Sequence, residues 1–325
     1  LDACGELLAA AFPDRVALRR PGAVGKYTLV NGRGAELPEG DPLARETFLV
    51  AADLDGAGAS SRIRAAAPVS EEAVRRQFAG QLRTEDDVYW DEAAMRVLAR
   101  RRTVLGALVL SETPLPSPDP ARVRETLLSA VAASGLSLLP WTKAAAQLLA
   151  RMRFVALYAG ENWPDVSEEA LTGSLDEWLG PFADGMKSRA DLERLNVHDA
   201  LLALLTWEQR RMLDEWAPAQ LTVPSGSRIA VDYSDPRAPS LSVRLQELFG
   251  WTDTPRLAGG RVPLTLKLLS PAQRPVQITQ DLAGFWRTTY FEIKKDLKGR
   301  YPKHYWPDDP LDAAATRGAK PKPQK

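Results

Sequence analysis

The sequence predicts an α+β fold in which an OB-like β-barrel, a helical segment and a terminal α+β domain follow one another. Three observations support this prediction. Short strand-like runs separated by turn residues fill the first third of the chain. Four prolines at alternate positions, 114 to 120, end that region. Beyond them, apolar residues recur at helical spacing before short strand-like runs return.

Composition places the chain among ordinary soluble globular proteins. Its 325 residues are 45% apolar and 26% charged, which is enough for two or three domains with cores of their own. The longest apolar runs, at 105–110 and 200–205, are too short for a membrane helix. The sequence contains no signal peptide. We therefore expect a cytoplasmic location and no membrane partner.

The first residues have the pattern of a helix that has already begun. Leu1, Leu7, Leu8 and Ala11 fit helical spacing, and no capping residue precedes them. We therefore interpret residues 1–11 as the end of a helical bundle that precedes this chain in a longer polypeptide.

Residues 12–113 are expected to form the barrel. The strand-like runs lie at 15–20, 26–30, 47–53 and 62–67, with Pro, Gly and Asn between them. A helix is predicted over 70–82, followed by a hairpin that leads from Tyr89 into a long strand over 95–111. Short strands at this spacing, with one intervening helix, are typical of a five-stranded OB-like barrel.

The second half begins after a proline linker, residues 114–120, that neither a helix nor a central strand crosses. A helical segment follows over 121–217, where Trp141, Ala145, Leu148 and Met152 share one face. The terminal α+β domain, 218–310, has strands at 220–223, 228–233, 262–269 and 275–278, then a long helix over 281–298. Residues 311–325 are small, basic and proline-containing, which predicts a disordered tail.

Catalytic and metal chemistry is not supported by the residues present. Cys4, His198 and His304 are too few for a zinc cluster. Residues 22–27 lack the spacing and the following helix of a phosphate loop, and residues 225–228 are not a nucleophile elbow. We expect no catalytic, cofactor-binding or metal-binding residues, and no catalysis by this chain alone.

Nucleic-acid binding would depend on local clusters, because Lys plus Arg and Asp plus Glu both total 42. One basic cluster lies in the barrel and another forms a stripe on the last helix, opposite its apolar face. After that helix, cations that can contact phosphates alternate with rings that can stack on bases. The candidate residues are Arg19, Lys26, Tyr27, Arg33, Arg287, Lys294, Lys298, Arg300, Tyr301, Lys303, Tyr305 and Trp306.

The same clusters have a structural interpretation. Tyr301, Tyr305 and Trp306, followed by Pro307, would anchor the C-terminal segment while the nearby charges stay solvated. The barrel cations would then lie on a solvated outer face. A third cluster, residues 100–102, alternates between the two faces of a predicted strand, which weakens it as a phosphate contact.

Many segments resemble one protein family. Segments similar to the C-terminal domain of HrpB-type bacterial DEAH ATP-dependent RNA helicases lie at 223–228, 232–233, 245–250, 258–264, 269–275, 279–283 and 299–307. Segments similar to the OB-like part that precedes this domain lie at 11–15, 31–35, 50–56 and 105–112. The resemblance implies an accessory portion of a helicase that guides single-stranded RNA and docks on the motor domains of the same polypeptide. ATP and magnesium would belong to those motor domains, whose motifs this chain lacks.

A protein-interaction or structural module is the alternative, binding the motor or an unknown protein partner without RNA. RNA binding that weakens as salt is added would indicate the first function. Salt-insensitive association that depends on aromatic residues would indicate the second.

Overall fold

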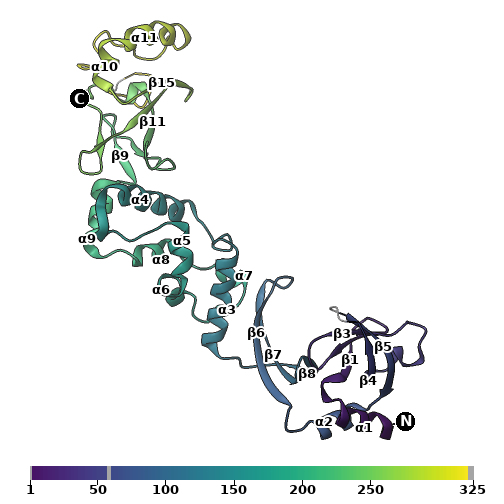
Figure 1. The fold of residues 1–325 in the computed structure, drawn as a ribbon. Coiled ribbons are helices and arrows are strands. Elements are labelled where there is room, and N and C mark those ends of the chain that lie inside the picture. Colours follow the sequence, from purple (N-terminus) through teal and green to yellow (C-terminus); the bar gives the residue numbers. More distant parts are fainter. Residues whose placement is uncertain (1, 57–59, 321–325) are drawn as a thin grey trace. The chain divides into compact units, whose positions relative to one another are not determined.

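A computed structural model describes residues 2–56 and 60–320 of the chain. It divides into two compact units, residues 1–127 and 128–325, which we describe separately (Figure 1). Among the described residues, no helix has the length and apolar character needed to span a membrane.

The first unit contains a closed five-stranded barrel with the order β1-β2-β3-β5-β4 (Figure 1). Its strands are β1 (Val16–Arg19), β2 (Lys26–Leu29), β3 (Gly34–Glu36), β4 (Phe48–Asp55) and β5 (Ser60–Pro68). The β3–β5 pair is parallel, and the other pairs are antiparallel. Alternating strand residues fill the interior, among them Ala17, Tyr27, Leu29, Leu49 and Ile63.

A second apolar cluster lies outside the barrel, against β1 and β4. Val16, Phe48 and Val50 pack there with Ala9 of α1 (Asp2–Ala11) and Val74 of α2 (Glu71–Gln77). The outward residues of β2 and β3, by contrast, include the exposed Lys26 and Glu36. One side of the barrel is thus covered by helices, and the other is open.

The strands after α2 form a separate antiparallel sheet with the order β6-β7-β8. They are β6 (Arg83–Asp91), β7 (Arg96–Leu105) and β8 (Leu108–Pro114). We expected these residues to complete the barrel, but β5 pairs with both β3 and β4, so the barrel closes by Pro68. The β7–β8 turn packs on the barrel: the Ala107 N–H donates to the Val30 carbonyl at 2.9 Å.

Helices dominate the first part of the second unit. The longest is α4 (Lys143–Ala159), which Thr142 caps and whose Leu148, Met152 and Val155 are buried, as their spacing predicts. The buried Arg151 donates to the Ala217 carbonyl at 2.6 Å and so ties α4 to the end of α9 (Trp207–Trp216). The other helices are α3 (Pro120–Ala133), which begins in the first unit, α5 (Glu168–Gly173), α6 (Leu175–Trp178), α7 (Arg189–Leu192), α8 (Val197–Ala203) and α9 (Trp207–Trp216).

The terminal part contains small sheets and two helices. The largest sheet has the order β11-β14-β15, with a parallel β11–β14 pair and an antiparallel β14–β15 pair. Its strands are β11 (Ser240–Arg244), β14 (Thr265–Leu269) and β15 (Pro275–Thr279). Two further pairs join β9 (Gln220–Thr222) to β10 (Arg228–Ala230) and β12 (Arg256–Leu257) to β13 (Val262–Pro263).

The single helix predicted over 281–298 is in fact two helices, α10 (Leu282–Arg287) and α11 (Thr289–Arg300). They are separated at Thr288, whose hydroxyl donates to the Gly284 carbonyl at 2.8 Å. This bond competes with the helical pattern, and two adjacent β-branched residues disfavour the helix further. Arg287 therefore lies on a different helix from Lys294 and Lys298, so the predicted basic stripe is not continuous.

Residues 311–320 have no regular secondary structure, but they are held in place. Thr316 is buried, and its N–H donates to the Gln246 carbonyl at 2.9 Å. The Gln246 amide donates in turn to the Gly318 carbonyl at 2.5 Å. The prediction of disorder rested on the small, basic and proline-containing character of the tail, whereas polar groups of η5 (Leu245–Glu247) order its backbone. Residues 321–325, the rest of the predicted tail, lie outside the described residues.

Candidate functional site

The exposed barrel cations lie on the open side of the barrel. Lys26 is in register with Glu36, and Glu36 with the exposed Arg62 of β5. Arg33 is exposed in the β2–β3 turn, where its guanidinium donates to the Ser61 hydroxyl at 3.0 Å. We call Lys26, Arg33 and Arg62 the basic barrel face. Sequence reasoning did not include Arg62, although its alternation with the buried Ile63 signals an outward position.

Tyr27 of β2 and Arg19 of β1 lie on the inner side of the β1–β2 pair. The Tyr27 side chain is 0% exposed, and its hydroxyl lies 2.7 Å from the Leu43 carbonyl oxygen. Burial raises the pKa of Tyr27 to about 12, although the nearby Arg19 opposes this shift. Arg19 is in register with Tyr27 and half-buried. The Tyr27 ring is therefore part of the core and is not available to stack on a base.

The three candidate aromatic residues near the C-terminus differ in their exposure. Trp306 is 8% exposed, and its indole N–H donates to the Tyr301 carbonyl at 3.1 Å, as an anchoring residue would. Tyr305 is partly exposed and meets Phe249 edge to face, with ring centroids 6.2 Å apart. The Tyr301 hydroxyl lies 3.4 Å from the Ser270 hydroxyl. Tyr305 is thus exposed and Tyr301 half-buried, while Trp306 is buried.

Carboxylates accompany two of the terminal-domain cations. Lys294 forms an ion pair with Asp308, and this bond holds the pKa of Asp308 below its usual value. Arg300 pairs with Asp296 at 3.1 Å. Lys298 and Lys303 are exposed, as is Arg287, whose guanidinium donates to the Ala283 carbonyl. The cluster is therefore less positive than its sequence indicates.

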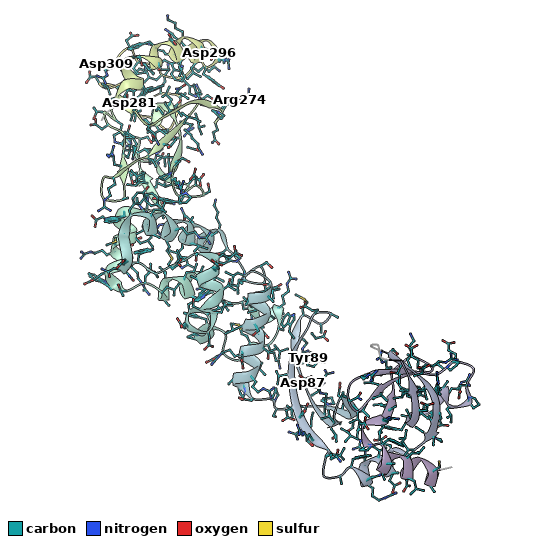
Figure 2. All side chains as sticks on the ribbon, viewed as in Figure 1. Asp87, Tyr89, Arg274, Asp281, Asp296 and Asp309 are labelled. Carbon is teal, nitrogen blue, oxygen red and sulfur yellow. The ribbon has the colours of Figure 1, made fainter. Side chains whose placement is uncertain are left out.

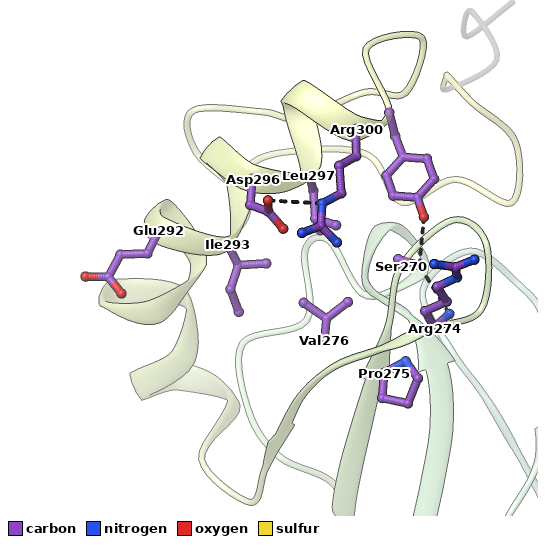
Figure 3. Close-up of a pocket in the computed structure, with 10 residues that line it drawn as sticks. Ser270, Arg274, Pro275, Val276, Glu292, Ile293, Asp296, Leu297 and Arg300 are labelled. Atoms are coloured by element: carbon purple, nitrogen blue, oxygen red, sulfur yellow. Dashed lines mark hydrogen bonds and ion pairs between the residues drawn. The ribbon is translucent and has the colours of Figure 1, made fainter.

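A pocket of about 370 Å³ lies between the β14–β15 turn and α11 (Figure 3). It brings Arg300 and Tyr301 together with Arg274, which sequence reasoning missed because it precedes Pro275 in a turn. The turn holds Arg274 firmly: its N–H donates to the Ser270 hydroxyl, and its carbonyl accepts the Ser270 N–H. The lining residues are Ser270, Arg274, Pro275, Val276, Glu292, Ile293, Asp296, Leu297, Arg300 and Tyr301.

A second pocket, of about 490 Å³, lies farther along β15 beside α10 and the start of α11. Its lining residues are Gln277, Thr279, Asp281, Gly284, Phe285, Arg287, Thr288 and Thr289. Arg274 and Asp296 mark the first pocket in Figure 2, and Asp281 marks the second. Because β15 contributes successive residues to both, we call the two pockets together the β15 groove.

The three consecutive arginines of β7, residues 100–102, are matched by carboxylates of the neighbouring strands. Arg100 contacts Asp87 at 2.9 Å and Glu112 at 3.0 Å, and its guanidinium lies over the Tyr89 ring. Arg102 also approaches Asp87, at 3.6 Å. Arg101 pairs with Asp86, which confirms that it lies on the other face. These ion pairs join strands and leave little net charge for a phosphate.

Comparisons with known proteins give a consistent result. Residues 81–115 match the family described as the connector region of the ATP-dependent RNA helicase HrpB, and residues 178–310 match the ATP-dependent helicase C-terminal family. The chain is 44% identical over 317 residues to the ATP-dependent RNA helicase HrpB of Escherichia coli (strain K12), covering 97% of the chain and 39% of that relative. It thus spans about two fifths of the relative's length.

Solved structures agree with this similarity. A crystal structure of the E. coli DExH-box NTPase HrpB matches 97% of this chain and 39% of its own, with 43% identity and a TM-score of 0.63. A crystal structure of the Escherichia coli DEAH/RHA helicase HrpB matches 93% and 38%, with 39% identity and a TM-score of 0.55. Both likenesses extend over nearly the whole chain.

Proposed function

The chain corresponds to the C-terminal region of HrpB-type ATP-dependent RNA helicases, and from this premise we propose that it guides single-stranded RNA along the basic barrel face. In this proposal it docks on the motor domains of the same polypeptide, which hydrolyse ATP with magnesium and act on cytoplasmic RNA. The chain itself contributes binding and no catalysis.

The observation that carries the proposal is the open side of the barrel. Its strand order, β1-β2-β3-β5-β4, is that of OB folds, whose β2–β3 side commonly binds oligonucleotides. Helices cover the opposite side, so RNA has access to the side that carries Lys26, Arg33 and Arg62. Cations on adjacent strands suit a phosphate backbone and impose no sequence preference.

The terminal domain contributes less to RNA binding in this proposal. Lys294 is paired with the carboxylate of Asp308, and Trp306 is buried. The alanine substitution of Arg287, Lys294 and Lys298 together is expected to weaken RNA binding less than the corresponding triple substitution in the barrel.

Fluorescence anisotropy of a labelled oligouridylate, titrated with the chain at several salt concentrations, tests the proposal. Replacing Lys26, Arg33 and Arg62 with alanine removes three phosphate contacts. The slope of log affinity against log salt should then become shallower by about 2, because each contact to a single strand contributes about 0.7.

The matched control replaces Arg75, Arg76 and Arg101 with alanine. These cations pair with Glu71, Glu6 and Asp86, away from the basic barrel face. The control should bind RNA as the unmodified chain does. The proposal fails if RNA does not bind even at low salt, or if both triple variants lose the same affinity.

A further inference from the structure

Strand β15 has an unpaired edge. It ends the order β11-β14-β15, and within the described residues it pairs with β14 and no other strand. The backbone N–H and C=O groups that point away from β14 can therefore bond an added strand. Ile278 stands beside this edge with 61% of its surface exposed, opposite Lys267. An added strand would find an apolar neighbour there on the outer face of the sheet.

The β15 groove lies along the inner face of the same edge. Val276 lines the first pocket, and Gln277 and Thr279 line the second, with α11 and α10 opposite. Alternate side chains of an extended chain point to one face and repeat about every 6.6 Å. The β14–β15 register shifts between Leu268 and Leu269, so the regular alternation of β15 holds from Gln277 to Thr279. The second pocket can therefore receive alternate side chains of an added strand, which is how strand-addition sites recognise sequence.

The Pro275 end of the groove contains two guanidinium groups and two hydroxyls, together with the carboxylates of Glu292 and Asp296. Arg274 and Arg300 line the first pocket together with the hydroxyls of Ser270 and Tyr301 (Figure 3). Guanidinium groups form strong, charge-assisted bonds with carboxylates. Arg300 and Asp296 are 68% and 58% exposed, so their existing ion pair is weak and can exchange for a ligand carboxylate.

The charge of the whole groove favours a polypeptide over RNA. Three arginines line it, Arg274, Arg287 and Arg300, together with three carboxylates, Asp281, Glu292 and Asp296. RNA carries a negative charge at every nucleotide, so a groove with equal numbers of arginines and carboxylates offers it no net attraction. An extended peptide needs a charge at one end only. The equal numbers of arginines and carboxylates distinguish the β15 groove from the basic barrel face.

We propose that the β15 groove binds the C-terminal end of a partner polypeptide, which adds to β15 as a further strand with its free carboxylate at Arg274 and Arg300. Because Pro275 is the first residue of β15, a peptide that ends there runs antiparallel to the strand. This site goes beyond the proposed RNA function and uses none of the residues of the basic barrel face.

Fluorescence polarisation with a panel of labelled heptapeptides tests the proposal. The peptides alternate valine and threonine, vary in their last residue, and carry either a free or an amidated C-terminus. Free-carboxylate peptides should bind the chain at least about tenfold more tightly than their amidated twins, since a charged hydrogen bond is lost. N-methylation of alternate peptide bonds should abolish binding by blocking the strand bonds.

Substitutions in the protein test whether the peptide carboxylate binds at Arg274 and Arg300. Joint replacement of Arg274 and Arg300 with alanine should remove the preference for a free carboxylate, whereas lysine at both positions should keep part of it. Joint replacement of Lys26, Arg33 and Arg62 with alanine should leave peptide binding unchanged, so this result is independent of the RNA proposal.

Three outcomes would overturn the proposal. One is equal binding of free and amidated peptides. Another is no binding of any peptide up to about 1 mM, the range of the weakest specific complexes. The third is displacement of the peptide by an oligouridylate whose own binding requires Arg274 and Arg300.

Discussion

Glu247 is a carboxylate that the terminal domain buries to 4% exposure. Burial by itself would raise its pKa, but hydrogen bonds from Ser227 and Ser225, together with the Arg244 guanidinium, outweigh burial and lower it. The Ser225 hydroxyl lies 2.8 Å from the carboxylate, and the Arg244 guanidinium also lies at 2.8 Å. The folded domain therefore holds Glu247 in its charged form.

Stability of the terminal domain should therefore fall in acid. A carboxyl whose pKa is lower in the folded state stabilises the fold above its unfolded value, about 4.3, and this stabilisation is lost as the pH falls through the folded pKa. The Glu247→Gln variant has no carboxyl to titrate at this position. Below about pH 4.3 its free energy of unfolding should therefore fall less than that of the unmodified chain. Urea denaturation at a series of pH values checks this, and equal acid sensitivity of both proteins would contradict it.

At the scale of elements, the turn between β7 and β8 joins the β6-β7-β8 sheet to the barrel. Gly106 occupies a left-handed conformation with φ of +54°, and a Cβ placed there would lie 2.4 Å from the Val30 carbonyl oxygen. Leu105 and Leu108, on either side of the turn, are buried in the outer cluster of the barrel. The turn therefore requires glycine because of both its backbone conformation and its close approach to Val30.

The Gly106→Ala variant should destabilise the first unit by about 2 to 5 kcal/mol, the sum of the left-handed backbone cost and a backbone clash. The matched control is Gly22→Ala. Gly22 has φ of +70° with nothing within 4 Å of the added Cβ, so the cost should be about 1 to 2 kcal/mol. Denaturation of the two variants, followed by hydrogen exchange of the barrel amides, measures the difference. Equal costs would show that the turn does not pack as described.

At the scale of the whole molecule, the terminal domain depends on contacts between residues far apart in the sequence. The tail contributes several of them: Arg317 donates to the Ser225 carbonyl at 3.2 Å, and Ala319 accepts the Tyr305 N–H at 2.7 Å. Removing the tail would also leave the Gln246 amide, which is buried, without its Gly318 partner.

A chain shortened to end at Pro310 should lose about 2 to 4 kcal/mol of terminal-domain stability, at about 1 kcal/mol for each hydrogen bond lost. A chain that ends at Lys320 keeps all of the described contacts and is the control. Thermal or urea unfolding of the two chains provides the comparison. If the shorter chain is as stable as the control, the tail does not hold the domain together.

Local pattern was sufficient to predict most elements. The buried face of α4 follows from residues three and four positions apart, and the strands of the barrel follow from alternation. That Arg101 and Arg100 lie on opposite faces of β7 could be predicted for the same reason. The segments similar to helicases also lie within short stretches, so the family could be recognised before any fold was known.

Only the tertiary structure determines which residues that are far apart in the sequence come into contact. Strand β5 closes the barrel because it pairs with both β3 and β4, a choice between partners that alternation does not contain. Lys294 pairs with Asp308, which is 14 positions away. The β15 groove joins a turn near Arg274 to the helix that carries Arg300. Periodicity comes from the geometry of the local backbone, whereas ion pairs and pockets arise when distant segments pack together, and this packing is not encoded in neighbouring residues.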